Sequence, residues 1–226
     1  MANKTSSERK SKGGRPASGT LAQRLEQLLE DATQVFLKHG YGSTSIDLVA
    51  REAHVAKRTI YQHFGDKDKL FGAVVRYRAN TVYLNSLPAI EDSSQSLSQA
   101  LEAFAHQLLD LVLLPDSIDL ERIVISEARR FPELAEQFYV NGPKHAIVTL
   151  AQYLEIQNQL GAIQLDNSMD AATHFFSLVL GEFHRRVLLG IDQPYSSEQI
   201  GRHVKELVRR FVSSYDMKLS TTAARR

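Results

Sequence analysis

The sequence contains no cysteine among its 226 residues. Neither a disulfide framework nor a thiolate metal site can therefore form, and the reducing cytoplasm is the expected compartment. No uncharged apolar run approaches the roughly 20 residues that cross a bilayer, since even Leu108–Leu114 is interrupted by Asp110 and closed by Pro115. The N-terminus also lacks the apolar stretch of a secretory signal. We expect a soluble chain with no membrane partner.

Sequence motifs of catalysis and metal binding are missing as well. The chain has no HExxH pair, no paired CxxC, no GxSxG elbow, no GxGxxG and no GxxxxGK[ST] loop. His174 and His184 lie ten residues apart with Glu182 between them, which is too loose for a metal motif. The sequence therefore predicts no catalytic residue, no metal site, no cofactor and no enzyme activity.

Charge is distributed unevenly along the chain. Residues 1–85 carry 14 Lys and Arg against 8 Asp and Glu, whereas residues 86–226 carry 13 against 18, although the net charge of the whole is only +1. A basic N-terminal part on an acidic remainder suits a polyanionic partner at one end. Chance clustering on a solvated surface explains the same numbers, so charge alone leaves both readings open.

Apolar residues repeat at spacings of three and four along most of the chain, and no segment alternates convincingly with period two. The fold class predicted is all-α. Residues 1–19 have almost no large apolar side chain and form an expected basic disordered arm. The helices are expected at Thr20–His39, from about Thr44, at Lys57–Phe64, from Asp66 to about Leu84, near Leu97–Leu111, Leu120–Arg129, Glu133–Val140 and Lys144–Leu160, and at Met169–Leu189 and Ser197–Lys218.

The third expected helix has an unusually polar exposed face. Ile60 and Phe64 share its buried side, which leaves the side chains of Lys57–His63 otherwise exposed. Three short helices with a tight turn between the second and third form a helix-turn-helix, in which the third lies in the major groove of DNA. An ordinary amphipathic surface turn has the same periodicity, so the pattern alone does not decide.

The stretch from Leu28 to Leu70 resembles the DNA-binding domain of the TetR/AcrR family of bacterial transcriptional regulators. The resemblance rests on Ala32, Phe36, Gly40, Thr44, Ser45, Val49, Ala50, Ala53, Val55, Thr59, Ile60, Tyr61, His63, Phe64, Lys67 and Leu70. It implies a helix-turn-helix that binds a double-stranded DNA operator. We expect phosphate contacts from Thr44, Tyr61, His63 and Lys67, base contacts from Lys57, Arg58 and Gln62, and either role for Thr59.

Three positions depart from the usual pattern of that family. His54 stands where the turn usually has Gly, so a left-handed backbone there would carry modest strain. Ala56 replaces the usual Ser cap of the third helix, at a local cost of about 1 kcal/mol. Asp47 places an acid near the expected DNA face, where it either caps its own helix or selects against some bases.

The arm contains Gly14, Arg15 and Pro16, which resemble the core of segments whose Arg enters the minor groove. We include Arg15 among the expected DNA contacts. A solvated tail that adds only non-specific phosphate attraction is the alternative.

The C-terminal part is similar to the AefR-like subgroup of regulatory domains. The similarity rests on Ser126–Leu134, Phe138, Tyr139, Gly142, Pro143, Gly161 and Asp170–Ala172. It implies that the last two helices form a four-helix bundle with those of a second copy. We assign the homodimer interface to the apolar stripe of the last helix: Ile200, Val204, Leu207, Val208 and Phe211.

A pocket for an unidentified small-molecule effector is expected among the middle helices. Candidates by residue type and expected face are Tyr77, Phe104, Gln107, Arg122, Phe138, Phe175 and Glu182, although each residue type is more often plain core or surface. We expect the fourth helix, which runs from the DNA reader to this pocket, to carry the response.

The predicted organisation is therefore a basic arm (residues 1–19), a helix-turn-helix domain (20–65), a helical regulatory and dimerisation domain (66–219) and a tail (220–226). The predicted function is a ligand-released repressor that binds a palindromic operator as a dimer. The alternative is a DNA-binding regulator of the same fold that has no effector and acts constitutively or architecturally.

Overall fold

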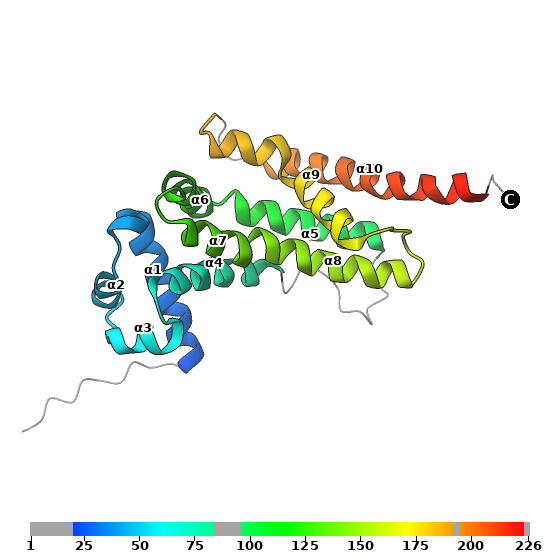
Figure 1. Ribbon diagram of the computed structural model, residues 1–226. Helices are drawn as coiled ribbons and strands as arrows, with labels where there is room; N and C mark the ends of the chain where they lie inside the picture. The colour runs from blue at the N-terminus through cyan, green and yellow to red at the C-terminus, as the bar shows by residue number, and fades with distance from the viewer. Residues whose placement is uncertain (1–19, 84–95, 192–194, 224–226) are drawn as a thin grey trace, which may run out of the picture.

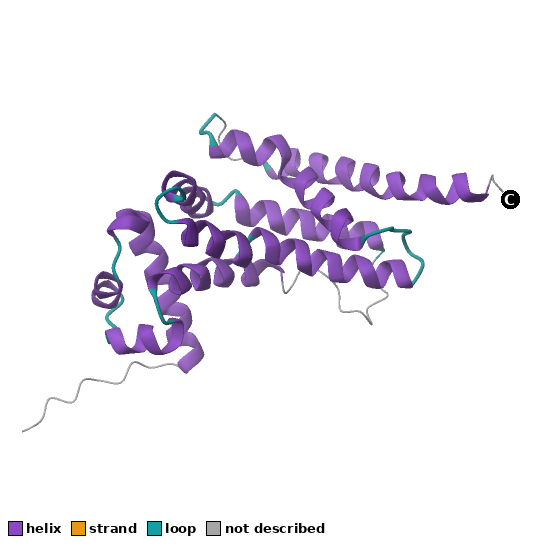
Figure 2. Ribbon diagram, in the orientation of Figure 1, coloured by secondary structure: helices purple, strands orange, loops and turns teal. Residues whose placement is uncertain are grey.

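Helices account for all the regular secondary structure in the part of the chain that the structure describes (Figure 2). This computed structural model describes residues 20–83, 96–191 and 195–223. In chain order the helices are α1 (Leu21–Ser43), α2 (Ile46–Glu52), α3 (Lys57–Phe64), α4 (Lys67–Tyr83), α5 (Leu97–Val112), α6 (Pro115–Glu127), α7 (Pro132–Asn141), α8 (Pro143–Gln159), α9 (Ser168–Leu188) and α10 (Ser197–Ala223). The all-α prediction is confirmed.

The helices form two groups that lie end to end (Figure 1). Helix α1 and the short helices α2 and α3 gather at one end of the molecule, and α4 leads away from them and packs along α7. At the other end α8 packs along α9, and α10 packs along α5. Helix α6 lies between the two groups and contacts α1.

The first hydrophobic core is built around three aromatic side chains with no exposed surface. The ring of Phe71 from α4 lies edge-on to those of Phe36 and Tyr41 from α1, with centroids 5.1 Å and 5.6 Å away. Leu120 from α6 and Leu134 from α7 belong to the same core. The hydrophobic core of the helix-turn-helix therefore extends beyond the predicted domain boundary at residue 65, since side chains from α6 and α7 complete it.

The second core joins α5, α8, α9 and α10. It contains all five residues that the sequence assigned to a dimer interface: Ile200, Val204, Leu207, Val208 and Phe211. Each of them is under 9% exposed in the single chain, so their side chains belong mainly to the core of the chain itself, and their part in a dimer interface stays a prediction. Apolar periodicity identifies the buried face of a helix, and here the neighbours that bury it come from the same chain.

Several helix boundaries follow from local residue chemistry. Gly40 has a φ of +72° inside α1, which places the break where the sequence predicted the helix to stop. Asp66 Oδ1 accepts the Lys69 amide at 2.8 Å and caps α4 as expected. Helix α6 begins at Pro115, five residues before its expected start, because proline is favoured in the first turn.

The aromatic core gives a test of stability. Replacing the fully buried Phe36 with Ala should lower the free energy of unfolding by about 3–5 kcal/mol, through lost burial and the cavity left behind. Tyr139→Ala on α7, where the side chain is 54% exposed, should change it by about 0.5 kcal/mol or less. Urea unfolding followed by circular dichroism measures both, and equal effects would contradict this description of the core.

Candidate nucleic-acid interface and ligand cavity

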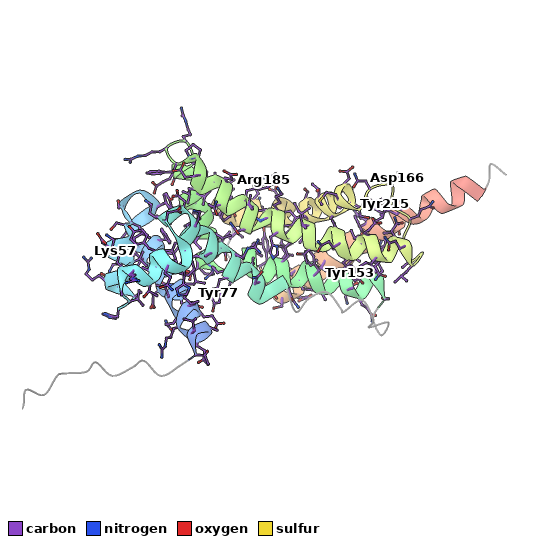
Figure 3. All side chains as sticks on the ribbon, turned by 60° about the horizontal axis from the view of Figure 1, so that its bottom comes forward. Lys57, Tyr77, Tyr153, Asp166, Arg185 and Tyr215 are labelled. Carbon is purple, nitrogen blue, oxygen red and sulfur yellow. The ribbon has the colours of Figure 1, made fainter. Side chains whose placement is uncertain are left out.

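Helix α3 shows one buried face and one polar face. Ile60 is fully buried, whereas Thr59 is half-buried. The exposed side chains are those of Lys57, Arg58, Tyr61, Gln62 and His63. Figure 3 shows Lys57 at the outer end of the molecule, on the side away from the second core. A short helix that projects cationic, amide and aromatic groups from a rigid support has the form of a DNA reader.

Lys57 forms an ion pair with Asp47, which the sequence analysis did not predict. Its Nζ lies 2.6 Å from Asp47 Oδ1, and both side chains are largely exposed. The hydrogen bond that Lys57 donates to the Asp47 carboxylate raises the pKa of Lys57. The ammonium also lies 5.7 Å from the centre of the Tyr61 ring. The first turn of α2 and the first residue of α3 are thus joined on the polar face.

Thr44 does not lie on that face. Its side chain is buried, and its hydroxyl donates to the Gly40 carbonyl at 2.7 Å. The cap of α2 is instead Ser45, whose Oγ accepts the Leu48 amide at 3.2 Å. The assignment of the Thr44 side chain to a phosphate is corrected, because the break at Gly40 turns it inward.

Lys67 also points toward the protein. Its Nζ donates to the Tyr41 carbonyl at 2.9 Å and lies 4.0 Å from the centre of the Tyr41 ring. Partial burial lowers the pKa of Lys67. Its ammonium thus has an internal partner, and its phosphate contact stays a prediction. Arg15 lies outside the described residues.

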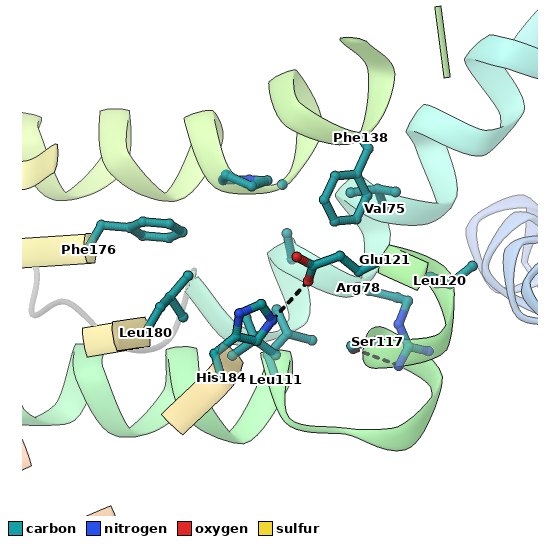
Figure 4. Close-up of a pocket in the computed structure, with 14 residues that line it drawn as sticks. Val75, Arg78, Leu111, Ser117, Leu120, Glu121, Phe138, Phe176, Leu180 and His184 are labelled. Atoms are coloured by element: carbon teal, nitrogen blue, oxygen red, sulfur yellow. Dashed lines mark hydrogen bonds and ion pairs between the residues drawn. The ribbon is translucent and has the colours of Figure 1, made fainter. Parts of the chain in front are cut away.

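A cavity of about 100 Å³ lies where α4 and α6 meet α5, α7 and α9 (Figure 4). Most of its wall is apolar, with Phe138 and Phe176 among the larger side chains. Its polar groups form two pairs. His184 Nε2 lies 2.9 Å from Glu121 Oε2, and the Arg78 guanidinium donates to Ser117 Oγ at 3.3 Å. An apolar void with a few oriented polar groups is the usual form of a small-molecule site.

Comparison with known proteins identifies both halves of this architecture. Residues 28–74 match the sequence model for bacterial regulatory proteins of the tetR family, and residues 99–217 match that for the C-terminal domain of the AefR-like transcriptional repressor. The chain belongs to the TetR family of bacterial transcriptional regulators. It is accordingly a DNA-binding regulator, and its relatives are regulators rather than enzymes.

Individual TetR-family proteins support the assignment over most of the chain. The flavonoid-responsive regulator FrrA is 32% identical with a TM-score of 0.68, and the match covers 85% of this chain and 97% of that one. A TetR-family regulator from Mesorhizobium loti is 26% identical with a TM-score of 0.69, covering 86% and 97%. The HTH-type regulator YvkB of Bacillus subtilis (strain 168) is 26% identical over 73% of this chain and 84% of its own length.

Two of the departures from the TetR-family pattern appear in the backbone. His54 has a φ of +53°, so it adopts the left-handed conformation that the usual Gly would take without strain. The Val55 amide after it donates to the Ala50 carbonyl at 3.0 Å and closes the turn. Ala56 supplies no side-chain bond to the start of α3. The turn between α2 and α3 thus closes with a His in the left-handed position and without a side-chain cap on α3.

Of the seven residues predicted for the pocket, only Phe138 lines the cavity. Phe104 and Phe175 are fully buried in the second core, and Gln107 lies half-buried on α5. Three others engage other partners: Tyr77 bonds Glu30, Arg122 donates to the carbonyls of Val187 and Leu188, and Glu182 pairs with Arg185. The other six do not line this cavity, because residue type and periodicity do not show which buried faces leave a void, and their contact with a ligand stays a prediction.

Within the described residues, no group of three or more His, Asp or Glu side chains is arranged to hold a metal ion. Over the same residues, no helix combines the length and apolarity that a bilayer crossing requires.

The Asp47–Lys57 pair leads to a prediction about DNA affinity. Asp47→Asn should tighten binding to random-sequence DNA about two- to fivefold at low salt, because it removes a negative charge beside the reader and releases Lys57 toward phosphates. The slope of log affinity against log salt should steepen by about one.

Glu52→Gln is the matched control. It makes the same change of charge on α2, but Glu52 pairs with Arg51 rather than with α3. Fluorescence anisotropy over a salt series measures both variants. An equal effect of the two substitutions would show that only net charge matters.

Proposed function

We propose that this TetR-family protein is a repressor that binds a palindromic operator as a homodimer and is released by a small molecule. The observation that carries the DNA-reading part is the exposed polar face of α3 on a fully buried support. Repression is supported by the AefR-like repressor model that its C-terminal part matches. The cavity supports the response to a ligand.

The exposure and chemistry of the α3 side chains indicate which of them contact bases and which contact phosphates. Lys57, Arg58 and Gln62 lie exposed on α3 and carry donors that suit base edges. Tyr61 and His63 are exposed on the same helix and suit phosphates. Asp47 lowers the non-specific affinity for phosphates. A Lys57 ammonium that is already paired with Asp47 gains less binding free energy from a single phosphate than an unpaired ammonium would.

The dimer surface consists of the outward faces of α9 and α10. The inward stripe of α10 is used within the chain, so a second copy must meet the residues on the opposite side. A shallow hollow between α9 and α10 is lined by Leu178 and Phe183 of α9 and by Arg202, His203, Glu206 and Leu207 of α10. Leu178 is 38% exposed although it is apolar. An exposed apolar group with a polar rim is the usual composition of an interface.

The cavity favours a compact, largely apolar ligand with one or two hydrogen-bonding groups. A volume of about 100 Å³ is small, so a larger ligand requires the surrounding helices to separate. The structural relative FrrA is described as flavonoid-responsive. Phe138 and Phe176 supply aromatic walls, and Arg78 and His184 supply polar groups, for a planar molecule of that general kind.

The operator can be found by selection from random DNA with the purified protein. Selected sites should be near-palindromes whose half-sites are spaced by about one helical turn or a multiple of it, because two-fold symmetry presents two α3 helices. Lys57→Ala should relax preference at one or two base positions at a cost of about 1–3 kcal/mol. Recovery of only asymmetric single sites would reject this mode of binding, and the absence of any preferred sequence would reject the function itself.

The dimer surface is tested separately. Leu178→Glu should convert dimers into monomers at micromolar concentration, since it places a charge in the apolar centre of the interface. Ile125→Glu, at a position that is 60% exposed on α6, should leave the dimer intact. Sedimentation equilibrium distinguishes the two. A dimer that survives Leu178→Glu unchanged would place the interface elsewhere.

A further inference from the structure

Helix α6 contributes both to the cavity and to the core of the helix-turn-helix. Ser117, Leu120 and Glu121 line the cavity. Leu120 and Val124, one helical turn apart, belong to the hydrophobic core that α1 to α4 form. A change in the shape of the cavity therefore acts on a helix that already packs into the DNA-binding part of the molecule.

The C-terminal end of α6 binds the backbone at the end of α1. Glu127 Oε1 accepts the amides of Tyr41 and Gly42 at 3.0 Å and 3.1 Å, and its Oε2 accepts the Gly42 amide at 3.0 Å. Hydrogen bonds between amides and an ionised carboxylate are stronger than those between neutral groups. The carboxylate thus fixes the turn that leads directly into α2.

The sequence of this turn leaves room for the carboxylate. A Cβ atom on Gly42 would lie 2.7 Å from Glu127 Oε2 and 3.3 Å from a ring carbon of Phe131. Gly40 has a φ of +72°, and a Cβ there would lie 3.2 Å from Glu127 Oε1. Gly42 therefore leaves the space that the carboxylate occupies, and Gly40 provides the positive φ at the turn.

The same turn is also bound by the start of α4. Lys67 donates to the Tyr41 carbonyl, and the Tyr41 hydroxyl donates to the Asp68 carboxylate. Glu127 contributes to the electrostatic surroundings of Lys67. The turn is consequently a point at which α1, α4 and α6 are joined by polar contacts.

The N-terminal end of α6 is attached to α1 as well. Gln34 of α1 donates to Asp116 Oδ2 at 3.3 Å. Arg78 of α4, which lines the cavity, lies 3.8 Å from the same Asp116 oxygen and bonds Ser117. Helix α6 therefore contacts α1 at both of its ends and through its apolar face between them.

We propose that Glu127 is a positioning residue through which α6 sets the orientation of the DNA reader, so that an occupant of the cavity acts on DNA binding by displacing α6. The regulatory part of this proposal rests on the proposed function, because it requires that the cavity receives a small molecule. The sequence predicted that the fourth helix carries the response. Helix α4 also helps to position the reader, because Lys67 binds the Tyr41 carbonyl and Arg78 lies beside Asp116 of α6. A displaced α6 carries the carboxylate with it and turns α2 and α3 away from their places on the operator.

The test uses the full chain with Glu127→Ala, Glu127→Gln and the control Glu136→Gln, which removes a charge from an exposed position on α7. Two spin labels are placed through Glu52→Cys on α2 and Gln152→Cys on α8, both exposed. The natural chain has no cysteine to compete for the label. Diluting labelled chains with unlabelled ones restricts the measured distance to a single chain.

Glu127→Ala should retain its helical circular dichroism, broaden or shift the distance distribution between the labels, and lower affinity for the selected operator about tenfold or more. Glu127→Gln should give an intermediate result, because one carbonyl oxygen still accepts the amides while its NH₂ opposes the Gly42 amide. Glu136→Gln should match the natural chain. An unchanged distance distribution in Glu127→Ala would overturn the proposal. If that variant loses its helicity, Glu127→Gln decides by the same criterion.

Coupling to the cavity is tested with a side chain as the occupant. Val112→Phe fills the cavity from α5, and it should shift the distance distribution and weaken operator binding in the natural background. Combined with Glu127→Ala it should add little, because the link that transmits it is already broken. Fully additive effects would overturn the proposed route.

The distance measurement needs no operator, so it keeps the two proposals separate. If selection finds no preferred DNA sequence, the proposed function fails while the label distances still show whether Glu127 positions the reader.

Discussion

The packing of α6 and α7 against α1 and α4 is the contact on which the rest of the architecture depends. Short helices such as α2 and α3 bury too little apolar surface to be stable alone, and they require a larger support. Leu120, Val124 and Leu134 come from helices much further along the chain, yet they complete the core that holds Phe36 and Phe71. The support of α3 is therefore built in part by helices from the C-terminal part of the chain.

This shared core also explains why polar contacts gather at the end of α1. A break at Gly40 leaves backbone amides that need acceptors, and Glu127 supplies them from a different part of the chain. Lys67 and Asp68 then bind the carbonyl and the hydroxyl of Tyr41. The cost of interrupting a helix is offset by a network that joins three elements, and the same network gives the cavity a physical connection to α2.

The reading face of α3 is less basic than its sequence suggests. Lys57 is paired across the turn with Asp47, so the positive charge that meets DNA is partly compensated. A lysine that is already paired with a carboxylate gains little binding free energy from an isolated phosphate. It gains more from a base edge with well-placed hydrogen-bond acceptors. The acid that departs from the family pattern is thus placed where it lowers the positive charge of this face, and His54 is a second departure that the turn accommodates, in a left-handed conformation.

The sequence by itself determined the helical class, the exposed polar face of α3 and the start of α4. These features depend on local periodicity and on caps such as Asp66, which act over a few residues. Only the tertiary structure decided which partner each buried face would meet. It turned Thr44 and Lys67 inward, used Ile200 to Phe211 within the chain, and placed the cavity beside Phe138 and His184 rather than beside Phe104 and Phe175. Those outcomes depend on contacts between residues far apart in sequence, and the apolar pattern of one helix carries no information about which other helix will cover it.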